Sequence, residues 1–135
     1  MSDNYRKNCF KKILDASSVY DIAIKSPVQF APKLSSKLKN KIYIKREDLQ
    51  PVFSFKLRGA YNKISKIKNP NHIVAASAGN HAQGVALSAL KLNCSATILM
   101  PITTPLVKVN AVRNLKATVI LFGDNYDETY KEACL

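Results

Sequence analysis

From about residue 41 onward, short apolar runs alternate with longer segments in which apolar residues recur at helical spacing. Short apolar runs bounded by turn residues are typical of buried strands, and spacings of three and four residues are typical of amphipathic helices. Strands separated by helices favour right-handed crossovers and a parallel sheet. The sequence therefore predicts an α/β fold, a parallel twisted sheet with flanking helices.

The same patterns set approximate bounds for each element. Strands are expected at 41–45, 72–77, 96–100 and 117–122. Helices are expected at 4–16, 54–68 (capped by Ser54), 80–92 and 105–114, with a short helix from Ser17 or Ser18 and a last helix capped by Asp124 or Asp127. Pro27 and Pro32 are expected to break the intervening stretch.

Composition limits the class of protein. A chain of 135 residues that is 47% hydrophobic has enough apolar surface for one modest packed domain. No apolar run approaches the ~20 residues that span a bilayer, so no membrane partner is expected. The first dozen residues are polar and lack the apolar stretch of a secretory signal, which predicts a cytoplasmic protein.

Metal and disulfide chemistry has few candidate residues. The three cysteines, Cys9, Cys94 and Cys134, are odd in number and form no CxxC pair. His72 and His81 are the only histidines. Neither a disulfide framework nor a metal site is expected.

The net charge of +12 leaves one alternative function open. A strongly basic chain can bind nucleic acid, in which case binding would weaken with salt and survive Lys56→Ala. The basic residues are mostly scattered lysines, which favours solvent-facing positions over a binding surface. We therefore expect no nucleic-acid partner.

Lys56 lies in the run SFKLRGA at residues 54–60. If Ser54 caps a helix, Lys56 occupies its first turn, where the helix dipole disfavours an ammonium. Phe53 and Phe55 are expected to bury the amine, and Arg58 to add a second positive charge. These effects favour the neutral amine that Schiff-base chemistry needs. Among 17 lysines, local pattern alone still favours a solvated lysine.

The run SAGNH at residues 77–81 joins an expected strand to an expected helix. Gly79 permits close approach of a ligand, and the helix start offers free N–H groups that suit a phosphate or carboxylate. Ser77 and Asn80 add side-chain donors. An ordinary strand-to-helix turn capped by Asn80 explains the run equally well, and a structural role is the favoured interpretation of His81.

Taken together, these runs resemble one known family. Residues 45–61 (KREDLQPVFSFKLRGAY) and 76–86 (ASAGNHAQGVA) resemble the lysine segment and the asparagine loop of biosynthetic threonine dehydratase, also called threonine ammonia-lyase. Met100-Pro101 and residues 123–128 (GDNYDE) fit the same pattern. The resemblance runs from about residue 18 to residue 135.

The resemblance implies fold type II of the pyridoxal-phosphate enzymes, in which the cofactor lies between two α/β domains. Residues 1–45 would belong to the large domain and residues 46–135 to an incomplete small domain. The implied reaction converts L-threonine to 2-oxobutanoate and ammonia, which begins isoleucine biosynthesis, and the family usually forms homotetramers.

Site residues follow from the same resemblance. Lys56 would carry pyridoxal 5'-phosphate and act as the base, Phe55 would line the cofactor site, and Asn80 would bond the cofactor's 3-hydroxyl. The substrate carboxylate would be held by four residues, Ser77, Gly79, Asn80 and His81.

Two departures from the family pattern limit the expected activity. The 135 residues contain only four glycines, and no glycine-rich run that would hold the cofactor phosphate. Ser26 stands where the family usually has threonine. The sequence therefore predicts an N-terminal fragment that is weakly active or inactive alone, or one half of a split lyase completed by a second chain.

Overall fold

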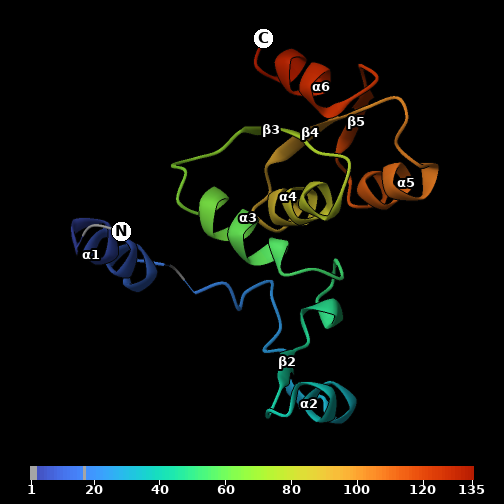
Figure 1. The fold of residues 1–135 in the computed structure, drawn as a ribbon. Coiled ribbons are helices and arrows are strands. Elements are labelled where there is room, and N and C mark those ends of the chain that lie inside the picture. The colour runs from blue at the N-terminus through green and yellow to red at the C-terminus, as the bar shows by residue number, and fades with distance from the viewer. Residues whose placement is uncertain (1–2, 17) are drawn as a thin grey trace.

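The structure, a computed structural model, describes residues 3–16 and 18–135. Its elements follow one another as in Figure 1. They are α1 (Asp3–Leu14), β1 (Val28–Phe30), α2 (Pro32–Leu38), β2 (Tyr43–Lys45), the 3-10 helix η1 (Glu47–Leu49), α3 (Lys56–Ile64), β3 (His72–Ala76), α4 (Asn80–Lys91), β4 (Ser95–Met100), α5 (Leu106–Asn114), β5 (Thr118–Leu121) and α6 (Tyr126–Ala133).

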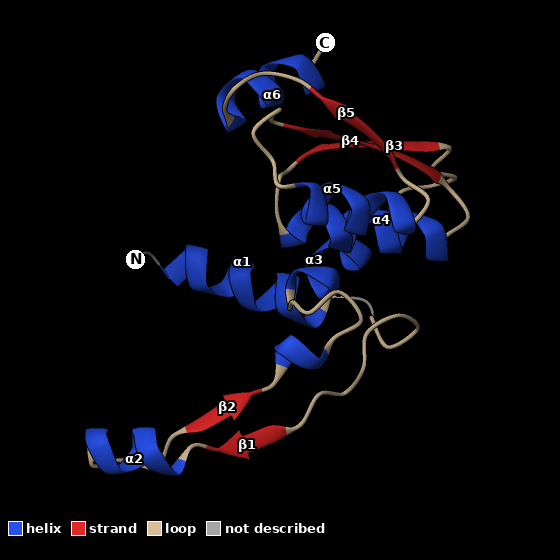
Figure 2. Ribbon diagram, turned by 90° about the vertical axis from the view of Figure 1, so that its right-hand side faces the viewer, coloured by secondary structure: helices blue, strands red, loops and turns tan. Residues whose placement is uncertain are grey.

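The larger part of the fold is a parallel sheet in the order β3-β4-β5. In its register Val74 lies beside Thr97, and Ile98 beside Val119. Helices α3, α4 and α5 lie on one side of this sheet and α6 on the other (Figure 2). The predicted parallel α/β sheet with flanking helices is confirmed.

The core lies between the sheet and α4. The buried face of α4 consists of small residues, and it packs against the centre of β4 and the inner face of α5. The fully buried residues of this contact include Ala82, Ile98, Met100 and Val109. Small side chains on α4 let the helix lie close to the sheet, which brings the loops at both of its ends near the strand ends.

A smaller unit precedes the sheet and was only partly predicted. Strands β1 and β2 pair antiparallel, with Gln29 opposite Ile44, and α2 connects them. Pro32 was expected to break this stretch, but it stands at the first position of α2, where a missing N–H costs no hydrogen bond. The prediction of a break was wrong because that position tolerates proline.

Two predicted helix starts also need correction. In place of a helix, residues 19–23 form a single turn, in which the Ala23 N–H donates to the Val19 carbonyl at 2.9 Å. Ser17 lies outside the described residues. The cap of α6 is Asn125, whose Oδ1 accepts from the Glu128 N–H at 3.1 Å. Neither of the two predicted aspartates caps that helix.

Within residues 3–16 and 18–135, no helix has the length and apolar character needed to cross a membrane. The same described part of the chain contains no cluster of three or more His, Cys, Asp or Glu that would hold a metal ion. Its three cysteines are free thiols.

Candidate functional site

Lys56 is the first residue of α3. The Ser54 hydroxyl accepts a hydrogen bond from the Lys56 backbone N–H at 3.2 Å, and Ser54 is buried. Phe55 stands between the two residues, so Ser54 lies one position further out than a standard cap but still satisfies an amide of the first turn. The predicted place of Lys56, at the start of a helix, is confirmed. The helix itself ends at Ile64, four residues earlier than predicted.

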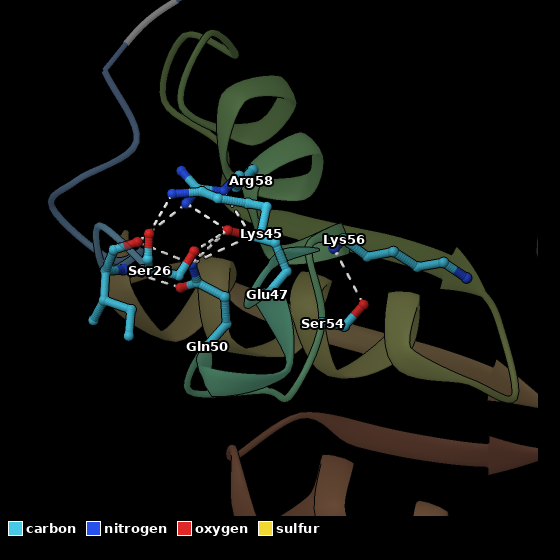
Figure 3. Close-up of polar contacts among 8 residues, drawn as sticks. Ser26, Lys45, Glu47, Gln50, Ser54, Lys56 and Arg58 are labelled. Atoms are coloured by element: carbon cyan, nitrogen blue, oxygen red, sulfur yellow. Dashed lines mark hydrogen bonds and ion pairs between the residues drawn. The ribbon is translucent and has the colours of Figure 1, made fainter. Parts of the chain in front are cut away.

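The side chain of Lys56 is exposed, as are those of Phe53 (75%) and Phe55 (62%). The expectation that the two phenylalanines bury the amine is therefore wrong for this structure. Among the residues that the structure describes, none forms a hydrogen bond or ion pair with the Lys56 amine. Figure 3 shows the Lys56 side chain extended away from the polar cluster around Glu47.

Arg58 points the other way. Its guanidinium donates to both carboxylate oxygens of Glu47, at 2.8 and 2.9 Å, and to the Ile24 carbonyl at 3.1 Å (Figure 3). Glu47 neutralises the charge of Arg58, so the expectation of a second free positive charge beside Lys56 is not met. Instead, Arg58 ties α3 to η1 and to the segment before β1.

The cluster around Glu47 is closed by two further side chains. Gln50, which is 1% exposed, donates to the Ile24 carbonyl and accepts from the Ile24 N–H, both at 2.9 Å. The Ser26 hydroxyl donates to Glu47 Oε1. Hydrogen bonds from Arg58, and secondarily from Ser26 and Gln50, outweigh partial burial and lower the pKa of Glu47 to about 2.

The second predicted run lies at the carboxyl end of β3, where it turns into α4. The Gly79 N–H donates to the Ser77 hydroxyl at 3.3 Å, and the Ala82 N–H donates to the Gly79 carbonyl at 3.0 Å. The backbone amides of Asn80 and His81 thus stand in the first turn of α4, where N–H groups lack intrahelical acceptors. A Cβ at Gly79 would meet nothing within 4 Å, so among the described residues none makes the close approach that the glycine permits.

His81 is affected electrostatically by Lys56. Partial desolvation, and then the positive charge of Lys56, lower the pKa of His81 below its ordinary value. This effect of the Lys56 charge on the imidazole agrees with the two side chains lining the same cavity. The neutral form of His81, which accepts as well as donates a hydrogen bond, is favoured there.

One cavity of about 490 Å³ contains this region. Its lining includes four of the predicted site residues, Phe55, Lys56, Ser77 and His81. Gly79 and Asn80 do not line it, although they belong to the same loop. Another cavity, of about 500 Å³, lies between the β1–β2 pair and α2, and it contains none of the predicted residues.

Tyr126 also lines the cavity of Lys56, and sequence reasoning gave it no role. It is the first residue of α6, placed there by the Asn125 cap and by Gly123, whose φ is +72°. One signal pointed to it, because it follows the carboxyl end of a predicted strand of a parallel sheet, where ligands gather.

The fold and the cavity define an α/β unit of the kind that binds a small molecule at the carboxyl ends of parallel strands. Here the site also holds a lysine whose amine has no partner among residues 3–16 and 18–135. The family of pyridoxal-phosphate dependent enzymes matches residues 19–134. The chain belongs to this family.

Its relatives include biosynthetic threonine dehydratases. It is 60% identical over 121 residues to the chloroplastic biosynthetic threonine dehydratase of Arabidopsis thaliana, covering 87% of this chain and 20% of that protein. It is 51% identical over 127 residues to the L-threonine dehydratase biosynthetic IlvA of Pasteurella multocida, covering 92% of this chain and 25% of that protein. The chain thus spans about a fifth to a quarter of these relatives' length.

A solved structure extends the similarity to the fold. The processed form of threonine deaminase isoform 2 from Solanum lycopersicum superposes with a TM-score of 0.87 at 50% identity, covering 98% of this chain and 37% of that one. Maize serine racemase gives a TM-score of 0.78 at 25% identity, covering 88% of this chain and 40% of that one. The resemblance to biosynthetic threonine dehydratases is confirmed.

Proposed function

We propose that this chain carries the lysine side of the active site of a threonine ammonia-lyase that uses pyridoxal 5'-phosphate. One observation supports it above all: the Lys56 amine is unpaired within the described residues and shares a cavity with Ser77 and His81. Relatives named threonine dehydratase match across both of the runs that form this cavity.

The residues present fit the lysine side of the cofactor. The Lys56 amine, which has no partner in the described part of the chain, would condense with the cofactor aldehyde, and Phe55 offers an apolar surface beside it. Asn80, exposed at the start of α4, would donate to the cofactor's 3-hydroxyl. Ser77 and Gly79, with the amides of Asn80 and His81, would hold a carboxylate at the helix start.

In the proposed reaction, L-threonine loses its α-proton and β-hydroxyl. The cofactor, when bound, supplies the electron sink for the carbanion at the α-carbon. The Lys56 amine, once free, accepts the α-proton, and the carboxylate contacts hold the Cα–H bond in place for that transfer. The water lost in elimination is regained in hydrolysis, which leaves 2-oxobutanoate and ammonia.

The 135 residues hold only part of what the reaction needs. They contain no glycine-rich run for the cofactor phosphate and no assigned group opposite the pyridine nitrogen. We infer that these residues alone bind the cofactor weakly and turn over little threonine. We also propose that the boundary between the large-domain segment and the small domain lies near residue 45.

A chimera tests the proposal directly. The region of the tomato threonine deaminase that this chain matches is replaced by residues 18–135, and release of 2-oxobutanoate from L-threonine is measured. We expect activity that Lys56→Ala removes and that Lys91→Ala, at an exposed lysine at the end of α4, leaves unchanged. A folded chimera in which Lys56→Ala retains its full rate would contradict the proposal.

If the chain is one half of a split lyase, a second chain should complete its activity. Co-expression with the adjacent coding sequence would then restore deaminase activity that neither product shows alone. We further propose a homotetramer, as the family resemblance implies, and a cytoplasmic location. Sedimentation of the active complex and fractionation of cells test these two points.

A further inference from the structure

The backbone at the start of α3 is in unusually close contact with α4. A Cβ added at Gly84 would lie 3.3 Å from each of three backbone atoms, the carbonyl carbon of Lys56 and the N and Cα of Leu57. Contacts this short between a side-chain carbon and backbone require one partner to give way by a few tenths of an ångström. Backbone atoms of a helix have no rotamer to change, so α3 itself would have to move.

Little around Gly84 is free to absorb such a movement. Gly84 is buried in the middle of α4, and its carbonyl accepts a hydrogen bond from the Ser88 hydroxyl at 2.6 Å. Leu57 is fully buried and packs with Ala23 and Val52. The strain would therefore be relieved at the exposed first turn of α3, where Lys56 lies.

The same turn is held from a second direction. Arg58, two residues after Lys56, is fixed by two hydrogen bonds to Glu47 and one to the Ile24 carbonyl. Glu47 and Arg58 have side-chain exposures of 16% and 24%, so solvent competes only partly for this pair. Figure 3 shows the Arg58 side chain leaving the helix on the side opposite to Lys56.

We propose that Gly84 and the Glu47–Arg58 ion pair are positioning residues for Lys56, an inference that rests on the proposed function. Gly84 sets how closely the Lys56 backbone approaches the loop that carries Ser77 and His81. The ion pair prevents the first turn of α3 from rotating or fraying, because fraying would separate Arg58 from Glu47. The amine thereby keeps a fixed place in the cavity.

The test measures where pyridoxal phosphate attaches, not turnover. The 135-residue chain is incubated with pyridoxal phosphate, whose aldehyde condenses with a lysine amine and releases water. Borohydride then supplies hydride to the C=N bond and makes the label permanent. Peptide mapping gives the ratio of label on Lys56 to label on the exposed Lys91, which serves as an internal reference.

Four variants separate positioning from general destabilisation. We expect Gly84→Ala and Glu47→Ala each to lower the ratio at least threefold. Glu47→Gln keeps an oxygen that accepts from Arg58 and should restore most of the ratio. Val109→Ala, a core truncation in α5 away from Lys56, should lower thermal stability and leave the ratio unchanged.

Two results would overturn the proposal while the proposed function stands: a wild-type ratio retained in Gly84→Ala, or an equal fall in Val109→Ala. A third result would also overturn it: if wild-type Lys56 is labelled no more than Lys91, the contacts around the start of α3 give the Lys56 amine no preferred place for the aldehyde. The proposed function is tested separately by the chimera, because the 135 residues alone are expected to bind the cofactor weakly.

Discussion

Arg58 donates hydrogen bonds to both carboxylate oxygens of Glu47, from Nε to Oε2 at 2.8 Å and from Nη2 to Oε1 at 2.9 Å. This pairing connects α3, which begins with Lys56, to η1, because Glu47 lies 11 residues before Arg58 in the chain. The bidentate geometry is the strongest that arginine offers a carboxylate. It makes one end of the candidate site dependent on the charge state of a single acid.

That dependence gives a stability profile with pH. Glu47 has a folded-state pKa of about 2 against an ordinary 4.5, so its contribution to stability is complete above pH 4.5 and is lost as pH falls toward 2. The shift corresponds to on the order of 2 kcal/mol after allowance for solvent screening. Urea unfolding at pH 6 and pH 3 should show this loss in the wild type.

The control for this profile is Glu47→Gln, which has no charge to lose. Its free energy of unfolding should change less between pH 6 and pH 3 than that of the wild type. Equal pH dependence in both proteins would show that other acids are responsible.

Gln50→Ala should destabilise the fold by about 1–2 kcal/mol, because the Ile24 amide loses its partner and the Ile24 carbonyl keeps only its hydrogen bond from Arg58. Gln50 is 1% exposed and makes both of those hydrogen bonds. Gln29→Ala, at an exposed strand position, should cost less than 1 kcal/mol. Denaturant midpoints measure both, and a Gln50→Ala effect no larger than that of Gln29→Ala would contradict the assignment.

Replacing glycine by alanine should change the free energy of unfolding in opposite directions at Gly123 and Gly59. Gly123→Ala is expected to destabilise by about 2 kcal/mol or more, since φ is +72° and the new Cβ would lie 2.6 Å from Glu128 Cβ. Gly59→Ala adds a Cβ within a helix where nothing lies within 4 Å, and should stabilise by about 0.5–1 kcal/mol. Thermal unfolding of the two single variants tests this. Two stabilised variants, or two destabilised ones, would contradict the prediction.

His81 should report on the charge of Lys56. Its pKa is lowered first by desolvation and then by the Lys56 ammonium, so Lys56→Met should raise it partway toward 6.5. Because the folded-state pKa lies below the unfolded one, protonation of His81 opposes folding, and its contribution to stability decreases as pH falls below 6.5. Titration of the imidazole by NMR in both proteins tests this, and an unchanged midpoint would place the two side chains too far apart to interact.

Local pattern predicted the parallel sheet and the helices around it because strand length, helical spacing and turn residues all agreed from about residue 72 onward. It failed where one residue has two roles. Proline can end a helix or stand at its first position, and at Pro32 it does the latter. Only the pairing of Gln29 with Ile44 shows that a helix joins two strands here. Asn125 was missed as a cap because aspartates on both sides of it satisfy the same rule.

Four of the residues singled out from the sequence line one cavity, but the electrostatics around them differ from the prediction. Ser77 and His81 follow the carboxyl end of β3, whereas Phe55 and Lys56 stand at the start of α3 after a strand of the separate antiparallel pair, and all four line one cavity. The direction in which Arg58 points depends on Glu47 and Ile24, which are distant in sequence, so no local pattern contains it. Tyr126 reaches the cavity only because α6 crosses the sheet face near β3.

Gln50 recognises the amide and carbonyl of Ile24, not its side chain, and Ile24 is 44% exposed. Substitutions should therefore accumulate faster at position 24 than at position 50 as such sequences diverge. Position 24 can accept almost any residue with an ordinary backbone. Position 50 must keep a side chain that both donates and accepts at that reach, which among the twenty residues leaves glutamine nearly alone.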